Sequence, residues 1–239
     1  MDMQKTMWTS YLNDVATVRR VSAVVAITAL LFGLALISGT ALGGEHDHHS
    51  QGMDAMRDIY TRSVASYNIP DLKLVDMNGA EVSLHKGLGG NDPIILNFIF
   101  TSCTAVCPVM SATFYHVQNQ LGPDRNKVRM ISISIDPEND TPEKLREYAS
   151  KYHAGPQWKM LTGSTENSIA VQRAFGVYRG NKMNHTPATF IRAGDKDKPW
   201  VRLDGFASAP DIVKEYRLSM RQDEDAVRHA AMSPDVAAP

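Results

Sequence analysis

The sequence predicts a layered α/β domain, in which helices cover a central sheet, behind one N-terminal membrane-spanning segment. Two apolar, β-branched runs of strand length occur at residues 93–100 and 128–135. Segments with helical spacing follow each of these runs, and an uncharged apolar stretch covers residues 21–44. Alternation of strands with helices implies βαβ crossovers, which place helices against the faces of a sheet.

The first strands are expected to form an N-terminal β-hairpin. Residues 72–76 and 82–84 flank Asn78-Gly79, a dipeptide whose tolerance of positive φ suits a tight turn. PIILNFIF, residues 93–100, follows as an uninterrupted apolar run. Because such runs are typical of strands buried on both faces, we place this strand at the centre of the sheet.

Helix signals punctuate the rest of the domain. A helix is predicted over 108–121, and a second over 141–152, where Asp140 supplies an N-cap, Pro142 a first-turn proline and Glu143 a capping-box acid. The remaining expected elements are a helix at 165–175, strands at 188–192 and 200–203, and a last helix from 209 to about 220.

The apolar run at 21–44 defines the domain organisation. It is long enough to cross a hydrocarbon core of about 30 Å, and Arg19 and Arg20 directly before it favour a cytoplasmic N-terminus. A signal peptide cleaved near Gly39 and Ala41 is the alternative. The interpretation is a cytoplasmic segment (1–20), an anchor (21–44), a linker (45–62), a folded domain (63–220) and a frayed tail (221–239). The folded domain would then face the periplasm from the inner (cytoplasmic) membrane.

The linker carries an unusual set of side chains. His46, His48 and His49 are followed by Met53 and Met56 in a polar tract without apolar periodicity. Imidazole and thioether groups suit copper or zinc, so the tract is a candidate metal-binding segment. A solvated tether with histidines of no function is the alternative.

Composition excludes several classes of function. Lys+Arg 25 against Asp+Glu 26 gives a formal net charge of -1, so no uniform basic field exists to hold a nucleic-acid backbone. The chain has 2 Cys, too few for a disulfide-dense scaffold or a four-thiolate zinc site. Any chemistry that the two cysteines perform must therefore involve them as one pair.

The cysteines stand in TSCTAVCPVM, where the central strand ends and a helix begins. Cys103 and Cys107 are close enough in sequence to reach each other or one metal ion. The start of a helix offers free N–H groups and positive potential, which stabilise a thiolate over a thiol. Metal binding and disulfide exchange both need a thiolate. The alternatives are a structural disulfide and two buried small hydrophobes.

Two separated motifs and a late histidine carry a resemblance to a known family. NFIFTSCTAVCPVM, ISISIDPENDTPEKLREY and His185 together resemble the Sco/SenC family, the thioredoxin-like copper-handling proteins of respiratory membranes. The resemblance implies a thioredoxin-like three-layer fold with a central mixed sheet, and copper held by Cys103, Cys107 and His185. Without it, His185 would be interpreted as a polar loop residue.

The expected function follows from that resemblance. It implies a membrane-anchored copper chaperone that assists assembly of a copper centre in a terminal (cytochrome c) oxidase. Its expected partners are the apo-oxidase copper subunit and a thiol reductase, which would keep the exported cysteines reduced. A nucleic-acid partner is not expected.

Two other activities stay open. Thr186-Pro187 resembles the proline loop beside the thioredoxin dithiol, where the X-Pro bond is cis, and this favours a periplasmic thiol-disulfide oxidoreductase acting through the same cysteines. A peroxidase would need a cysteine supported by Thr and Arg. Thr101 is nearby, but no arginine follows the cysteines closely.

Overall fold

A computed structural model describes residues 60–194 and 197–232 of the chain. The predicted anchor at 21–44 and the His46–Met56 tract lie outside these residues. Within the two described ranges, no helix is both long and apolar enough to cross a membrane.

The centre of the fold is one mixed sheet of eight strands in the order β1-β8-β7-β4-β5-β6-β2-β3. β4 pairs in parallel with β5 and antiparallel with β7, while β5 and β6 are parallel. The strands are β1 (Tyr60–Ala65), β2 (Lys73–Asp76), β3 (Glu81–Ser83), β4 (Ile94–Ile99), β5 (Arg129–Ser134), β6 (Trp158–Thr162), β7 (Ala188–Arg192) and β8 (Trp200–Gly205).

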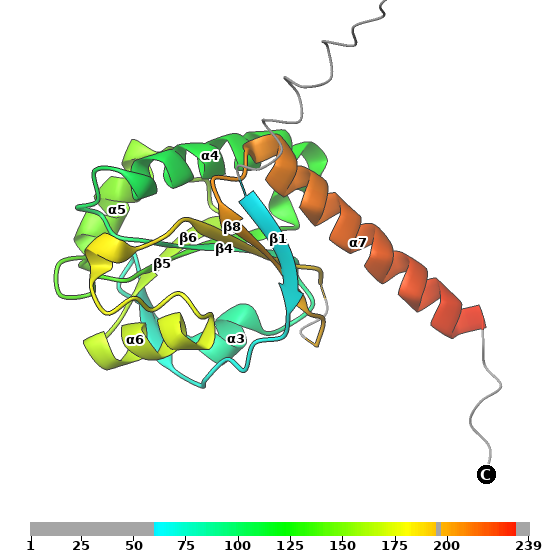
Figure 1. The fold of residues 1–239 in the computed structure, drawn as a ribbon, viewed down its shortest axis with the longest axis horizontal. Helices are drawn as coiled ribbons and strands as arrows, with labels where there is room; N and C mark the ends of the chain where they lie inside the picture. Colours follow the sequence, from blue (N-terminus) through cyan, green and yellow to red (C-terminus); the bar gives the residue numbers. More distant parts are fainter. Residues whose placement is uncertain (1–59, 195–196, 233–239) are drawn as a thin grey trace, which may run out of the picture. The chain divides into compact units, whose positions relative to one another are not determined.

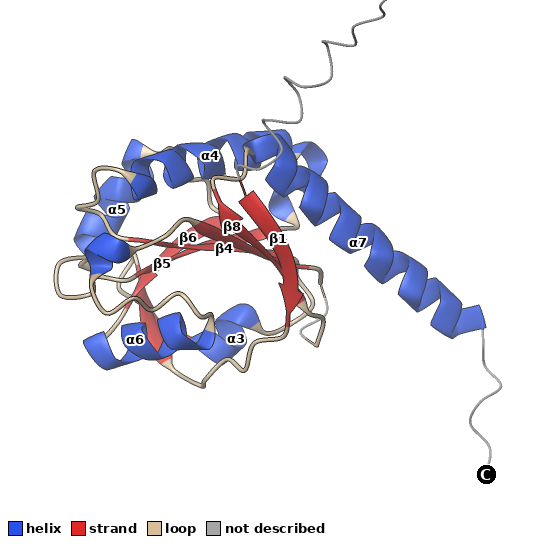
Figure 2. Cartoon of the chain, viewed as in Figure 1, coloured by secondary structure: helices blue, strands red, loops and turns tan. Residues whose placement is uncertain are grey.

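Helices cover both faces of this sheet and make three layers (Figures 1 and 2). One face carries α4, α5 and α7, whose apolar side chains share a core with the sheet, and the other carries α3 and α6. The helices are α3 (Leu84–Leu88), α4 (Val106–Gln120), α5 (Pro142–Lys151), α6 (Thr165–Ala174) and α7 (Ala209–Met232), with short 3-10 turns η1 (Gly122–Asn126) and η2 (Lys182–Asn184).

The central predictions are confirmed. β2 and β3 form the N-terminal hairpin, with Gly79 at a positive φ of 85° in its turn. β4 is fully buried and has a strand on each side, as its uninterrupted apolar run indicated. The β4–α4–β5 unit gives an expected parallel pair, and the β5–α5–β6 unit adds a second with a strand that the sequence did not predict. The motif-bearing segments are therefore held at the ends of central strands.

Three elements, β1, β6 and α3, were not predicted from the sequence, and the end of the last helix was predicted too early. The tail after Met220 was expected to be frayed, but α7 continues to Met232. β1 begins at Tyr60, inside the segment interpreted as linker. Its mostly exposed side chains lack an apolar pattern, because this edge strand is held by its ladder with β8 rather than by burial.

The predicted cap of α5 is also corrected. The N-cap is Thr141, whose side chain accepts a hydrogen bond from the Lys144 amide, and Pro142 is the first helical residue. Asp140 is fully buried and its carboxylate points to other partners. This displacement by one residue matters for the site.

Candidate functional site

The two cysteines lie where β4 ends and α4 begins. Cys103 is half-buried in the connecting loop, and Cys107 is fully buried in the first turn of α4. Both are free thiols. The Cys107 amide donates a hydrogen bond of 3.3 Å to the Cys103 sulfur, so the predicted proximity of the pair is confirmed.

The Cys103 sulfur takes the place of a helix cap. The N-cap residues of α3, α5 and α6 are Ser83, Thr141 and Ser164. Each hydroxyl accepts a hydrogen bond from an amide in the first turn of its helix. At α4 the cap position is Ala105, whose methyl side chain cannot accept a hydrogen bond. The sulfur of Cys103 accepts the free N–H instead, and this geometry favours a negative charge on it.

The environments of the two thiols are opposite. Partial burial opposes ionisation of Cys103, but amides of Cys107, Ala105 and Val106 and the Cys107 thiol together lower its pKa below the ordinary value. Burial raises the pKa of Cys107 far above the ordinary value, although its sulfur accepts the Phe100 amide at 3.4 Å. The site therefore presents one accessible thiolate-forming cysteine and one buried thiol.

Asp140 fastens the cysteine loop to the second motif. Its carboxylate accepts the Thr101 amide at 3.1 Å, the Thr101 hydroxyl at 2.6 Å and the Ser134 hydroxyl at 2.6 Å. Thr101 directly follows Phe100, whose amide holds Cys107. Adjacent amides thus hold the carboxylate and the buried thiol, and the charge of Asp140 contributes to the raised pKa of Cys107.

His185 is anchored at the same strand end. Its ring is buried, and Nε2 lies 3.1 Å from the carbonyl oxygen of Phe98. Burial lowers the pKa of His185, so the ring is neutral near pH 7. A neutral ring that donates from Nε2 keeps its lone pair on Nδ1, which is then the atom suited to bind a metal ion.

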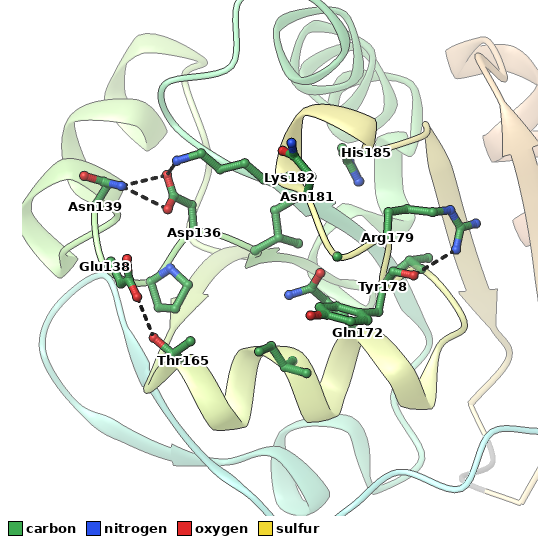
Figure 3. A pocket seen from close by; sticks show the side chains of 15 residues that line it. Asp136, Glu138, Asn139, Thr165, Gln172, Tyr178, Arg179, Asn181, Lys182 and His185 are labelled. Carbon is green, nitrogen blue, oxygen red and sulfur yellow. Dashed lines mark hydrogen bonds and ion pairs between the residues drawn. The ribbon is translucent and has the colours of Figure 1, made fainter.

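The segment that carries His185 borders a polar cavity of about 400 Å³ (Figure 3). Across this cavity Lys182 reaches Asp136 with an N–O distance of 2.5 Å, and Asn139 donates to the same carboxylate. Lys182 also lies 5.7 Å from the centre of the Phe100 ring. The Asp-Pro end of the second motif thereby holds the histidine segment in place.

The expected ligands are only partly assembled. Cys103 and Cys107 are together, but among the described residues no group of three or more His, Cys, Asp or Glu side chains is arranged to hold a metal ion. The His185 ring hydrogen-bonds to Phe98 and meets Phe100 edge-on at 6.5 Å. The donor types nevertheless fit copper, because two thiols and one neutral imidazole are soft and intermediate ligands.

The thioredoxin-like proline loop is not borne out. Throughout the described ranges every peptide bond is trans, including Thr186–Pro187. The Pro187 carbonyl accepts the Gly205 amide at 2.9 Å, and β7 pairs with both β4 and β8. Because both edges of β7 are occupied within the chain, this strand has no free edge for a client peptide.

The contact of Asp140 with Thr101 was not predicted from the sequence. The aspartate was interpreted as a local cap, since its neighbours form a helix start. Only the parallel pairing of β4 with β5 brings residues after the two strands together at one end of the sheet. The repeated Asp-Pro and Asp-Thr-Pro pattern was the available signal that this turn has a second role.

The fold and site define a thioredoxin-like protein with an asymmetric dithiol at the start of a helix. A family model described as SCO1/SenC matches residues 63–225. The chain belongs to the SCO1/SenC family, as the two motifs indicated.

Curated relatives agree with this assignment. The SCO1 protein homolog of Bacillus subtilis is 34% identical over 105 residues, which cover 44% of this chain and 53% of that protein. The mitochondrial SCO1 homolog 1 of Arabidopsis thaliana is 30% identical over 156 residues, or 60% of this chain and 45% of that protein. The chain spans about half the length of these curated relatives.

The similar solved structures include a copper-bound protein. Bradyrhizobium japonicum ScoI with copper bound is similar at a TM-score of 0.52 and 26% identity, over 66% of this chain and 100% of that one. BsSco, described as a member of the Sco family of cytochrome c oxidase assembly proteins, has a TM-score of 0.56 and 26% identity, over 66% and 96%.

Proposed function

We propose that this chain is a copper chaperone, anchored in the inner membrane by residues 21–44, that carries copper to a terminal (cytochrome c) oxidase from the periplasmic side. The dithiol supports this proposal most directly. One thiol is accessible and has a lowered pKa, the other is buried beside it, and a neutral histidine is anchored at the same strand end. Copper is the cargo of the site.

Cys103, Cys107 and His185 are the proposed ligands. Release of the Nε2 hydrogen bond to Phe98 would let the ring move toward the sulfurs, with Nδ1 as the copper ligand. Three ligands of this kind suit Cu(I) and can also hold Cu(II). Burial keeps the Cys107 thiol protonated, and this thiol must lose its proton to bind copper. Copper uptake should therefore release protons.

The test is copper titration of the reduced full-length protein without oxygen. We expect one tightly bound copper per chain, lost in Cys103→Ser and Cys107→Ser and weakened about tenfold or more in His185→Ala. His116→Ala is the matched control, since His116 is an exposed histidine of α4. His185→Ala protein that binds copper as well as wild type would refute the ligand set.

The His46–Met56 tract has its own test. If it binds metal independently, the full-length protein should take up a second, weaker copper equivalent that disappears when His46, His48 and His49 are replaced by alanine. Equal stoichiometry in both proteins would make the tract a plain linker.

The asymmetry of the thiols also supports a second activity, thiol–disulfide exchange. The Cys103 thiolate would attack a client disulfide and release one client thiolate, giving a mixed disulfide. The Cys107 thiolate would then attack the Cys103 sulfur, which forms the internal disulfide and releases the reduced client. Cys107→Ser should trap the mixed disulfide on a gel, and absence of such an adduct would count against this activity.

A further inference from the structure

Three segments that carry the site contain no charged residue. Residues 101–123, 183–191 and 205–210 contain no Asp, Glu, Lys or Arg, although these types make up 21% of the chain. The first segment contains the dithiol and α4, and the second contains His185. The third follows the last strand of the sheet and leads into α7.

Sheet topology brings one part of each segment to the same end of the sheet. β4 ends where the first segment begins, and β7, antiparallel to β4, starts within the second. β8 is antiparallel to β7 and ends in the third segment, where the Gly205 amide bonds to the Pro187 carbonyl. The start of the first segment, the start of β7 in the second and the start of the third therefore lie near the end of β4.

Exposed apolar side chains gather in the same segments. In the part of the chain that the structure describes, the exposed large hydrophobic residues are Val64, Val109, Met183 and Phe206, with exposures of 52%, 50%, 71% and 40%. Three of these four lie in the charge-free segments. We call Val109, Met183 and Phe206, together with the half-buried Cys103, the neutral face.

Two charged residues that border the neutral face in sequence are ion-paired. Lys182, beside Met183, is paired with Asp136, and Arg202 is paired with Asp204 just before Phe206. Single exposed hydrophobics are ordinary on protein surfaces. A group of them, in charge-free segments that also carry Cys103 and His185, has the composition of an interface core.

We propose that the neutral face is the surface on which the copper-receiving domain of the oxidase docks. This inference rests on the proposed function, because transfer of copper requires the receiving ligands to approach Cys103 directly. Charge complementarity requires that the partner's surface around its own copper ligands is also uncharged and apolar. Burial of apolar area, rather than long-range attraction between charges, then drives association.

The test uses copper-loaded full-length protein and the purified apo copper domain of the oxidase. Met183→Glu and Phe206→Glu should each slow copper transfer and weaken complex formation about tenfold or more, since a charge would be buried in the interface. Copper affinity of the two variants should stay unchanged. Val64→Glu is the matched control, because this equally exposed hydrophobic lies on the edge strand β1. Wild-type association should change less than about threefold between low and high salt.

Each other outcome has a definite meaning. Wild-type transfer and complex formation in both glutamate variants would overturn the proposal, and so would a steep salt dependence of the wild type. Variants that still bind the oxidase copper domain but no longer react with a thioredoxin-like reductase would assign the surface to the reductase. This result would also overturn the proposal. Failure of the wild type to bind copper would refute the proposed function instead, and complex formation between the apo proteins would still decide the docking surface.

Discussion

Cys103 and Cys107 acquire different chemistry from their positions in one turn of chain. The sulfur of Cys103 lies at the open N-terminus of α4, where it accepts an amide that no cap satisfies. The sulfur of Cys107 lies beneath the helix, near the carboxylate of Asp140. A helix terminus stabilises an anion, whereas burial and a nearby anion destabilise one.

This difference predicts the order of alkylation. Iodoacetamide should react with Cys103 in the Cys107→Ser variant at least about tenfold faster at pH 7 than with Cys107 in the Cys103→Ser variant. The lowered pKa of Cys103 keeps the thiolate present at lower pH, so its rate should decline only when the pH falls below that pKa. The raised pKa of Cys107 should keep its rate low through neutral pH.

The control for this measurement is the unfolded chain. In strong denaturant both thiols lose their surroundings and should react at similar rates. Equal rates in the native variants would mean that the helix terminus does not distinguish the two cysteines.

Asp140 predicts a second effect at the scale of single residues, on stability. Asp140→Ala would leave the Thr101 amide, the Thr101 hydroxyl and the Ser134 hydroxyl without their acceptor. A buried donor without a partner costs about 1–3 kcal/mol, so a loss of about 2–4 kcal/mol in the free energy of unfolding is expected by urea titration. Asp124→Ala, which removes only a surface ion pair with Lys127, should cost less than about 1 kcal/mol. Similar losses in the two variants would contradict this role of Asp140.

At the scale of elements, the site depends on segments that enter from different strands. The loop after β5 holds the cysteine loop through Asp140, and through Asp136 it holds the segment before β7 that carries His185. The Nε2 contact with Phe98 secures that segment at a second point. Movement of His185 toward the sulfurs therefore depends on how firmly Lys182 and Asp136 hold η2.

Lys182→Met should loosen this segment selectively. Without the ion pair, amides of residues 181–186 should exchange with deuterium faster, while global stability falls by only about 1 kcal/mol because Lys182 is partly exposed. Hydrogen exchange read by mass spectrometry measures both effects. Lys127→Met, which breaks a more exposed ion pair at the end of η1, should leave this segment unchanged. Unaltered exchange in Lys182→Met would show that other contacts hold η2.

Elements were predictable where their signal is local. β4 and the start of α5 follow from an apolar run and from a proline-containing first turn. β1 and β6 were not predictable in this way, because β1 is a mostly exposed edge strand and the exposed Lys159 interrupts the apolar run of β6. The cysteine pair was also predictable from a local signal, because the two cysteines are only four positions apart in the sequence. The partners of His185 and Asp140 come from distant strands, and the sequence could not provide those contacts.

At the scale of the whole molecule, β1 and α7 close one end of the sheet. β1 pairs with β8 from Tyr60 to Ala65, and Arg62 binds Glu215 of α7 at 2.8 Å. Glu215 is nearly buried, so this ion pair joins the edge of the sheet to the helix that covers it. The family match begins at residue 63, inside this strand, and so does the folded domain predicted from the sequence.

The position of β1 predicts where the folded domain begins. A chain that starts at Ser63 loses the pairing of Tyr60, Thr61 and Arg62 with β8, and it leaves Glu215 without its cation. Each hydrogen bond contributes about 0.5–1.5 kcal/mol, so this chain should be about 1–3 kcal/mol less stable in urea than one that starts at Tyr60. Arg62→Met in the longer chain measures the share of the ion pair alone and should account for only part of the loss. Identical urea midpoints for the two chains would mean that the first half of β1 adds nothing to the domain, and that the domain begins where the family match does.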